Sequence, residues 1–93
     1  MIPLPNKVTA ADVENSILEE TYTLLPNGRT TICQLTLIDN GDSGFTVEGQ
    51  SACVSKSNYD KALGEKIARE DALNKVWMLL GYQVAVQLQK QYK

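Results

Sequence analysis

The feature that most constrains the fold is a change of apolar spacing in the second half of the chain. From Phe45 to Cys53, apolar or small residues occupy every second position, which is typical of a strand with one buried face. From Asn58 to at least Leu80 the spacing becomes three and four residues, which predicts a long helix. In a domain of 93 residues, such a helix must contribute a large part of the core.

The predicted long helix carries apolar residues on two sides. One side combines small and larger residues that suit close packing on a sheet: Ala68, Ala72, Val76 and Leu79. The roughly opposite side carries Tyr59, Leu63, Ile67, and Trp77 with Met78. A helix that is apolar on two sides needs two partners, of which the sheet is one and the first helix or a second copy is the other. We therefore expect a homo-oligomer, most simply a dimer, with an interface that includes Tyr59, Leu63, Ile67 and Trp77.

The first half of the chain predicts a short helix followed by strands joined in hairpins. Thr9 and Asp12 have the spacing of a capping box, and the helix they open, over about 10–19, places Val13, Ile17 and Leu18 on one face. Strands follow over 20–25 and 29–38, separated by Pro-Asn-Gly, and the turn 39–44 leads to the third strand. Folding the second hairpin about Gly41 places Leu37 near Phe45 and Leu35 near Val47.

These elements define the expected architecture. Their order is α-β-β-β-α, an α+β fold in which a three-stranded antiparallel meander packs on a long C-terminal helix. Residues 1–8 contain two prolines and are expected to form an extended arm, and 9–93 a single domain. Ser57 and Asp60 have the spacing of a second capping box at the start of the long helix. Residues 82–92 alternate like a strand and also fit a helix, which their Gln and Lys residues favour.

Composition argues against several classes of function. The net charge of −2 argues against the basic surface of a duplex nucleic-acid binder, and no apolar run approaches the roughly 20 residues that span a membrane. The amino end lacks the pattern of a signal peptide, so the cytoplasm is the expected compartment. The chain has no His, and Cys33 and Cys53 fit neither a disulfide scaffold nor a zinc site. We expect free cysteines that face the core, no metal or cofactor, and no enzyme activity.

One corner of the predicted fold has the features of a ligand site. Residues 55–58, Ser-Lys-Ser-Asn, lead into the long helix, whose first N–H groups are unpaired and carry a positive partial charge. Lys56 and Lys61 flank this point and would stabilise a phosphate or carboxylate, although Ser57 can equally serve only as a helix cap. The candidate ligand-binding residues are polar positions in or near this corner: Gln50, Ser51, Ser55, Lys56, Ser57, Asn58, Lys61, Lys66 and Lys75.

A second group of charges lies near the turn of the hairpin. Asp39, Asp42 and Glu48 gather there without the ligand spacing of a calcium loop. We interpret them as a solvated hairpin tip.

The element order is similar to that of the double-stranded-RNA-binding domain. Residues 65–76, "EKIAREDALNKV", also resemble the second helix of that domain. The lysine cluster that opens the helix in that domain is replaced here by Lys56, Lys61 and Lys66, with Glu65 between them. An RNA-binding module is therefore an alternative, and nucleic acid is not the expected main partner.

A closer resemblance rests on motifs spread over about residues 16–88. The segments are "TICQLTL", "GFTVEGQSACV", "NYD", "ALNKVW" and "GY". Their order and spacing resemble those of a small tailed-phage protein family typified by gene product 49 of phage N4 and gene 66 of phage Sf6. The chain departs from the family pattern at Gln50, over 78–80 and by an insertion in the hairpin turn.

The resemblance implies a tailed-phage origin and a setting in the cytoplasm of the infected bacterial host. The family it points to has no established activity. Because the sequence also lacks a catalytic constellation, we expect a non-enzymatic accessory protein that binds a host protein, as in inhibition, takeover or counter-defence. The alternative is a small-molecule binder that sequesters a phosphorylated nucleotide signal.

Overall fold

The computed structural model describes residues 8–38 and 44–91, and it confirms the predicted α+β order. In chain order the elements are α1 (Ala10–Asn15), β1 (Ile17–Leu24), β2 (Thr30–Leu37), β3 (Phe45–Ala52), the short 3-10 helix η1 (Lys56–Asn58) and α2 (Lys61–Gln91). The predicted arm, apart from Val8, and the hairpin turn with Asp39 and Asp42, apart from Gly44, lie outside the described residues.

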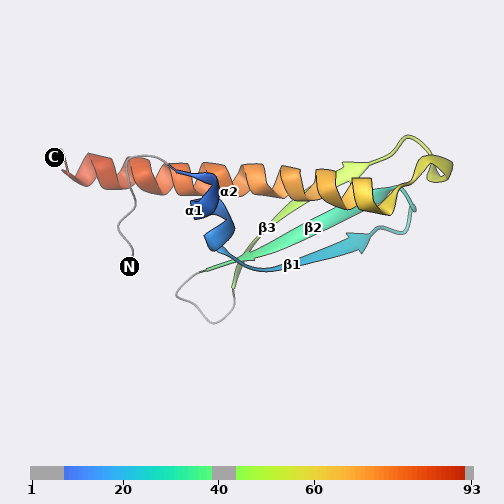
Figure 1. Ribbon diagram of the computed structural model, residues 1–93, viewed down its shortest axis with the longest axis horizontal. Helices are drawn as coiled ribbons and strands as arrows, with labels where there is room; N and C mark the ends of the chain where they lie inside the picture. Colours follow the sequence, from blue (N-terminus) through green and yellow to red (C-terminus); the bar gives the residue numbers. More distant parts are fainter. Residues whose placement is uncertain (1–7, 39–43, 92–93) are drawn as a thin grey trace.

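The three strands form one antiparallel sheet in the order β1-β2-β3, with α2 across one of its faces (Figure 1). The pairing of β2 with β3 is the predicted one, with Leu37 opposite Phe45 and Leu35 opposite Val47. The face of β2 that is turned toward α2 is buried, whereas Gln34 on the other face is exposed. The alternation of the sequence therefore determined which side of the sheet became the core.

The core is formed where α2 lies closest to β3. Ala68, Ala72 and Val76 of α2 are fully buried against the sheet. A Cβ atom added to Gly49 of β3 would lie 2.2 Å from the backbone nitrogen of Ala72. Since no side chain fits there, Gly49 and the two alanines together allow the helix backbone to rest directly on the strand.

The first helix is shorter than predicted. Its start is confirmed, because Thr9 Oγ1 accepts the N–H of Asp12 at 3.2 Å and the Asp12 carboxylate accepts the N–H of Thr9 at 2.9 Å. The helix ends at Asn15, and Ile17 and Leu18 belong to β1 rather than to a helical face. The reason is pairing: Ile17 lies opposite Leu37, and the carbonyl of Ser16 accepts the N–H of Ile38 at 2.9 Å.

The start of the long helix was also predicted wrongly. The Ser57 hydroxyl caps no helix and lies 3.0 Å from the Ser55 hydroxyl. Helix α2 begins at Lys61, and Asp60 caps it by accepting the N–H of Leu63 at 3.1 Å. The physical reason is the extended backbone of Tyr59, which separates the 3-10 turn from the helix and leaves Asp60 at the capping position.

Helix α2 continues through residues 82–91, so the helical alternative for this segment is the correct one. Its 31 residues span about 46 Å, whereas the eight residues of β3 span about 27 Å. The last turns of α2 therefore extend past α1 and beyond the sheet (Figure 1). The radius of gyration is 15.9 Å, against about 12 Å for a compact chain of this length. Within the described residues, no helix has the length and apolarity needed to cross a membrane.

Candidate functional site

A surface pocket of about 200 Å³ lies between the end of β3 and the start of α2. Its walls are partly apolar, with Tyr59, Leu63 and Ile67 on one side. Its polar residues include Arg29, Thr31, Ser51, Asn58 and Asp60. Residues from β2, β3, the segment before α2 and the first turns of α2 therefore meet at one place, which the sequence spacing does not reveal.

The floor of the pocket is formed where Gly64, in the first turn of α2, packs closely on the sheet. The position that a Cβ atom of Gly64 would occupy is 3.0 Å from Thr31 Oγ1, 3.6 Å from Ser51 Oγ and 3.7 Å from Tyr59 Cε1. Ser51 Oγ is satisfied, because it donates to the carbonyl of Gly64 at 2.6 Å. The contact with Thr31 would be tight for any side chain at position 64, so glycine allows the first turn of α2 to approach β2 and β3.

Thr31 is the unusual residue of this floor. Its side chain is only 2% exposed, and its Oγ1 has no hydrogen-bond partner among the residues the structure describes. Most buried hydroxyl groups in proteins do have a partner. The Thr31 hydroxyl is thus an unpaired polar group that the close approach of Gly64 helps to cover.

The rim of the pocket is held by Arg29 and by Cys53. The Arg29 guanidinium donates from Nη1 to the carbonyls of Val54, at 3.2 Å, and Cys53, at 3.5 Å. The thiol of Cys53 is half-buried and lies 3.1 Å from the carbonyl of Ser55. The prediction that both cysteines face the core is therefore right for Cys33 only, because Cys53 follows the last residue of β3 and lines the pocket instead.

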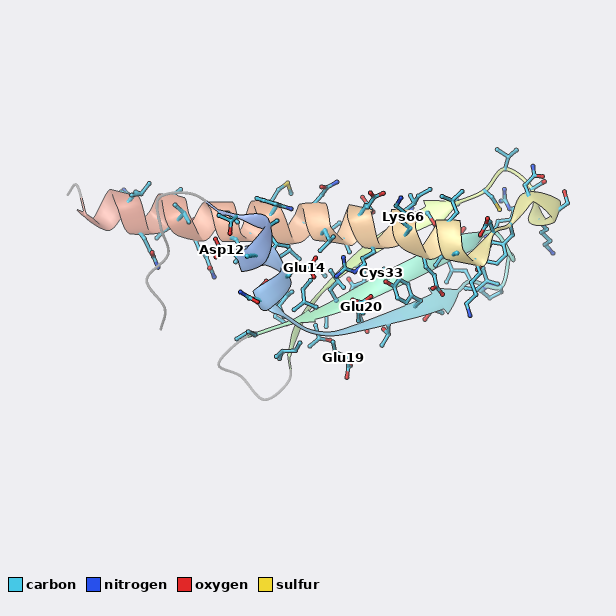
Figure 2. All side chains as sticks on the ribbon, viewed as in Figure 1. Asp12, Glu14, Glu19, Glu20, Cys33 and Lys66 are labelled. Carbon is cyan, nitrogen blue, oxygen red and sulfur yellow. The ribbon has the colours of Figure 1, made fainter. Side chains whose placement is uncertain are left out.

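A separate charged cluster joins α1, β1 and α2. Arg69 of α2 forms ion pairs with Glu14 at 2.9 Å and Glu20 at 3.2 Å, and the Tyr22 hydroxyl donates to Glu20 at 2.6 Å. Figure 2 shows Glu14 and Glu20 on the side of the sheet that faces α2, and Glu19 pointing the other way. This cluster was not predicted from the sequence. The signal for it was the position of Arg69 between the buried residues Ala68 and Ala72, where a guanidinium needs acidic partners.

The charges of this cluster shift one another's ionisation. The hydrogen bond from Tyr22, together with Arg69, lowers the pKa of Glu20. Burial, with the hydrogen bond to Glu20, raises the pKa of Tyr22, and hydrogen bonding to Glu14 raises the pKa of Arg69. Burial also raises the pKa of the Cys33 thiol. The shifts of Glu20 and Arg69 favour the charged forms that pair with one another, so the cluster ties α1 and β1 to α2.

Residues 8–88 match the family model described as the phage protein (N4 Gp49/phage Sf6 gene 66) family. The chain belongs to this phage protein family. The resemblance read from the strand and helix motifs is thereby confirmed. No curated protein and no solved structure matches the chain. The family match covers the sheet, the pocket and most of α2.

The structure separates the predicted ligand residues of this phage protein. Ser51 and Asn58 line the pocket. The side chain of Lys56 instead lies against Gly28 in the turn between β1 and β2, and Lys61 lines a second hollow beside Tyr22 and Glu65. Lys66 lies on the side of α2 away from the sheet (Figure 2). The lysines therefore do not converge on one ligand site. In the first turn of α2, the N–H of Leu63 already donates to the Asp60 carboxylate.

Two further candidate positions stabilise the edge of the sheet. The backbone N–H of Gln50 donates to Asp71 Oδ2 at 2.9 Å, and Lys75 Nζ donates to the carbonyl of Glu48. Asp71 and Lys75 lie one turn apart on α2 and satisfy two backbone groups of β3 that an adjacent strand would otherwise bond. They protect this edge of the sheet from pairing with another chain.

No group of His, Cys, Asp and Glu side chains that could hold a metal ion occurs within 8–38 and 44–91.

Proposed function

We propose that this phage protein is a non-enzymatic accessory protein that acts in the cytoplasm of the infected host by binding other proteins. The surface we assign to this role is the C-terminal half of α2. The observation that supports it is the exposure of large apolar side chains there, with Met78 70% and Tyr82 71% exposed. Trp77 and Leu79 beside them are also exposed.

This part of α2 breaks the usual rule for surface helices. A surface helix is normally polar on the side that faces water, and a helix that is apolar all round is normally buried. Residues 76–80 are Val-Trp-Met-Leu-Leu, which places apolar side chains around the whole circumference of the helix. Val76 is buried and Leu80 packs against the core, whereas Trp77, Met78 and Leu79 remain exposed, and we propose that another protein covers these exposed side chains.

A second copy of the chain is the first partner we propose. Two copies related by a twofold axis would bring the same apolar segments together, which is the simplest way to cover identical surfaces. Of the predicted interface residues, Tyr59, Leu63 and Ile67 line the pocket at the other end of α2, so Trp77 is the member that lies on this surface. The proposed dimer is therefore centred on Trp77, Met78 and Tyr82.

We propose that the dimer binds a host protein, and that this binding serves host inhibition, takeover or counter-defence. The RNA-binding alternative has less support, because Lys56, Lys61 and Lys66 lie at different places and Asp60 and Glu65 lie between them. A net charge of −2 also gives little attraction for a phosphate backbone.

The experiment measures the molecular mass and the capture of a partner for the native chain, for a double variant of the exposed surface and for a control variant. Light scattering of the native chain at micromolar concentration is expected to give the mass of a dimer. The double variant Met78→Gln, Tyr82→Gln is expected to give a monomer that melts at the temperature of the native chain only at concentrations too low for the native chain to dimerise, since neither side chain is in the core. The matched control is Val54→Gln, at an exposed apolar position on the other end of the molecule, which is expected to remain a dimer.

Capture of a host protein is then tested with a purified candidate identified from the lysate of a bacterial host. Binding that is lost in the double variant and kept in Val54→Gln supports the proposal. A monomeric native protein disproves the dimer, and equal capture by all three proteins disproves the role of α2 in host binding.

A further inference from the structure

We propose that the free edge of β1 binds an extended, basic segment of another protein as a fourth strand of the sheet. This edge is the opposite one from the edge of β3 that Asp71 and Lys75 protect. The inference concerns β1 and does not depend on the protein-binding surface of α2. It rests on the outer backbone groups of β1, on a hollow beside the strand and on the charges around it.

The outer backbone groups of β1 have no hydrogen-bond partner among the residues that the structure describes. The N–H of Leu25 donates to the carbonyl of Thr30 at 2.8 Å, which marks a hydrogen-bonded pair at the turn between β1 and β2. Such pairs alternate along antiparallel strands, so the register directs the backbone groups of every second residue of β1 toward β2. The residues between them direct their N–H and C=O groups outward: Glu20, Tyr22 and Leu24.

The two edges of the sheet differ in protection. On β3, Asp71 accepts the N–H of Gln50, and Lys75 donates to the carbonyl of Glu48. Helix α2 runs along β2 and β3, and β1 is the strand that lies farthest from it (Figure 1). Six of the eight residues of β1 are exposed. Because a row of unpaired N–H and C=O groups is a template for another strand, β1 is the edge at which a strand can be added.

The side of β1 that faces α2 has room for the side chains of an added strand. A hollow there is bordered by Tyr22 and Leu24 of β1 and by Tyr59, Lys61 and Glu65. Leu24 is 46% exposed, since α2 covers β2 and β3 instead of β1. An added strand would place every second side chain on this side, next to Tyr22 and Leu24. Apolar residues at these positions would remove apolar surface of both strands from water.

The charges around β1 favour a basic partner. Four acidic side chains border the strand and its hollow, against two basic ones: Glu14, Glu19, Glu20 and Glu65, with Lys61 and Arg69. Arg69 is already shared by Glu14 and Glu20, whereas Glu19 forms no ion pair within the described residues. A Lys or Arg opposite Glu19 would complete a cross-strand pair, whereas a second copy of β1 would add two more carboxylates to the edge. We therefore expect a segment of a different protein.

The test uses the peptide acetyl-Lys-Val-Thr-Val-Thr-Val-Lys-amide as the probe. If its central Val pairs with Tyr22, the three valines lie beside the hollow and the last Lys lies opposite Glu19. The full chain is titrated with this peptide and followed by two-dimensional NMR of the backbone amides. Saturable shifts are expected at Glu20, Tyr22 and Leu24, and none at Gln50 on the protected edge.

Modified peptides separate strand pairing from general adhesion. N-methylation of the central Val removes an N–H that faces β1 and is expected to weaken binding at least about tenfold, because one hydrogen bond is lost and a methyl group lies between the strands. N-methylation of the first Thr, the matched control, changes an N–H that faces away and is expected to leave the affinity unchanged. Replacing both Lys by Glu is expected to weaken binding about threefold at low salt and less at high salt.

Two variants of one residue test the same edge from the protein. Leu24→Pro removes an outward N–H and is expected to abolish peptide binding, since proline is tolerated on an edge strand and cannot donate to a further strand. Leu24→Val keeps this N–H and is expected to bind. Comparable melting temperatures of the two variants show that the fold is intact. If Leu24→Pro does not fold, the methylated peptides decide.

The proposal is wrong if the peptide gives no saturable shifts at the β1 edge, if both methylated peptides bind equally well, or if folded Leu24→Pro binds like the native chain. Shifts at this edge that grow with protein concentration in the absence of peptide would indicate self-pairing of β1 and would also overturn it. The double variant Met78→Gln, Tyr82→Gln is expected to bind the peptide as the native chain does. The failure of this proposal and the failure of the α2 dimer are therefore distinguishable.

Discussion

The two halves of α2 both carry apolar residues, but these residues have different surroundings. In the N-terminal half, Ala68, Ala72 and Val76 are 0% exposed, because β3 and β2 lie beneath them. In the C-terminal half, Met78 and Tyr82 are largely exposed, because they lie on the side of the helix opposite Val76, which is buried in the core. Apolar residues in a helix therefore predict that a partner exists, and they do not tell whether the partner belongs to the same chain.

The glycines make the same comparison. Gly49 lies directly under the backbone of α2, and Gly64 packs so closely over Thr31 that an added Cβ would lie 3.0 Å from its Oγ1. Gly81, in the projecting half, has no described atom within 4 Å of the position that a Cβ would take. Packing therefore requires glycine at positions 49 and 64. No contact within the described chain requires glycine at position 81.

The largest effect is expected at the closest approach of helix and strand. Gly49→Ala forces β3 away from the α2 backbone and is expected to lower the free energy of unfolding by about 3 kcal/mol. Gly81→Ala is the matched control and is expected to raise it by about 0.5 kcal/mol, since alanine is the better helix former. Urea denaturation followed by circular dichroism measures both. A mild effect of Gly49→Ala would show that helix and sheet can separate at little cost.

The second prediction compares one buried and one exposed apolar residue of α2, two positions apart. Val76→Ala is expected to lower the free energy of unfolding by about 2 kcal/mol, because it leaves a cavity in the core. Met78→Ala is expected to change the stability of the isolated chain by less than about 0.5 kcal/mol. Denaturation at several protein concentrations checks this, since a dimer that buries Met78 makes its substitution costly only at high concentration.

The third prediction concerns the ion pairs that fix α1 to the packed half of α2. The pKa of Glu20 is lowered from the ordinary value of 4.5 by Tyr22 and Arg69. A carboxyl whose native pKa is lowered stabilises the fold fully above that ordinary value and loses this contribution as the pH falls through the native pKa. In the Glu20→Gln variant, the free energy of unfolding is therefore expected to depend less steeply on pH below 4.5. At neutral pH this free energy is expected to be lower than that of the native chain by up to about 1 kcal/mol.

The control for this measurement is Glu19→Gln, since Glu19 lies on the other face of the sheet (Figure 2). It is expected to keep the acid dependence of the native chain. If the two variants behave alike, the cluster around Arg69 contributes nothing specific to stability.

The smallest effect is expected at the protected edge of β3. Asp71→Ala removes the acceptor of the Gln50 N–H, which water can then reach, so a loss of about 0.5 kcal/mol is expected. The sharper readout is hydrogen exchange, in which the amide of Gln50 should exchange faster while that of Cys33 in the central strand does not change. Unchanged protection of Gln50 would mean that Asp71 does not protect this edge.

Much of the architecture was predictable because it depends on local patterns. The alternation along 29–38 and 45–53, folded about the turn 39–44, was enough to pair Leu37 with Phe45. The spacing of Ala68, Ala72 and Val76 predicted the helix face that packs on the sheet. Helix ends were harder, because the end of α1 depends on the pairing of Ile17 with a strand about twenty residues away, and the start of α2 depends on the backbone of Tyr59.

The sequence by itself determined the order of the main elements and the buried faces of β2 and α2, since these depend on periods of two and of three to four residues. Only the tertiary structure decided which residues meet. It brought Thr31 of β2 beside Gly64 of α2, separated the lysines that appeared to share one corner, and left the last turns of α2 beyond the sheet. The physical reason is that a spacing fixes the direction of a side chain on its own element, whereas a site depends on the crossing of two elements and on where each of them ends.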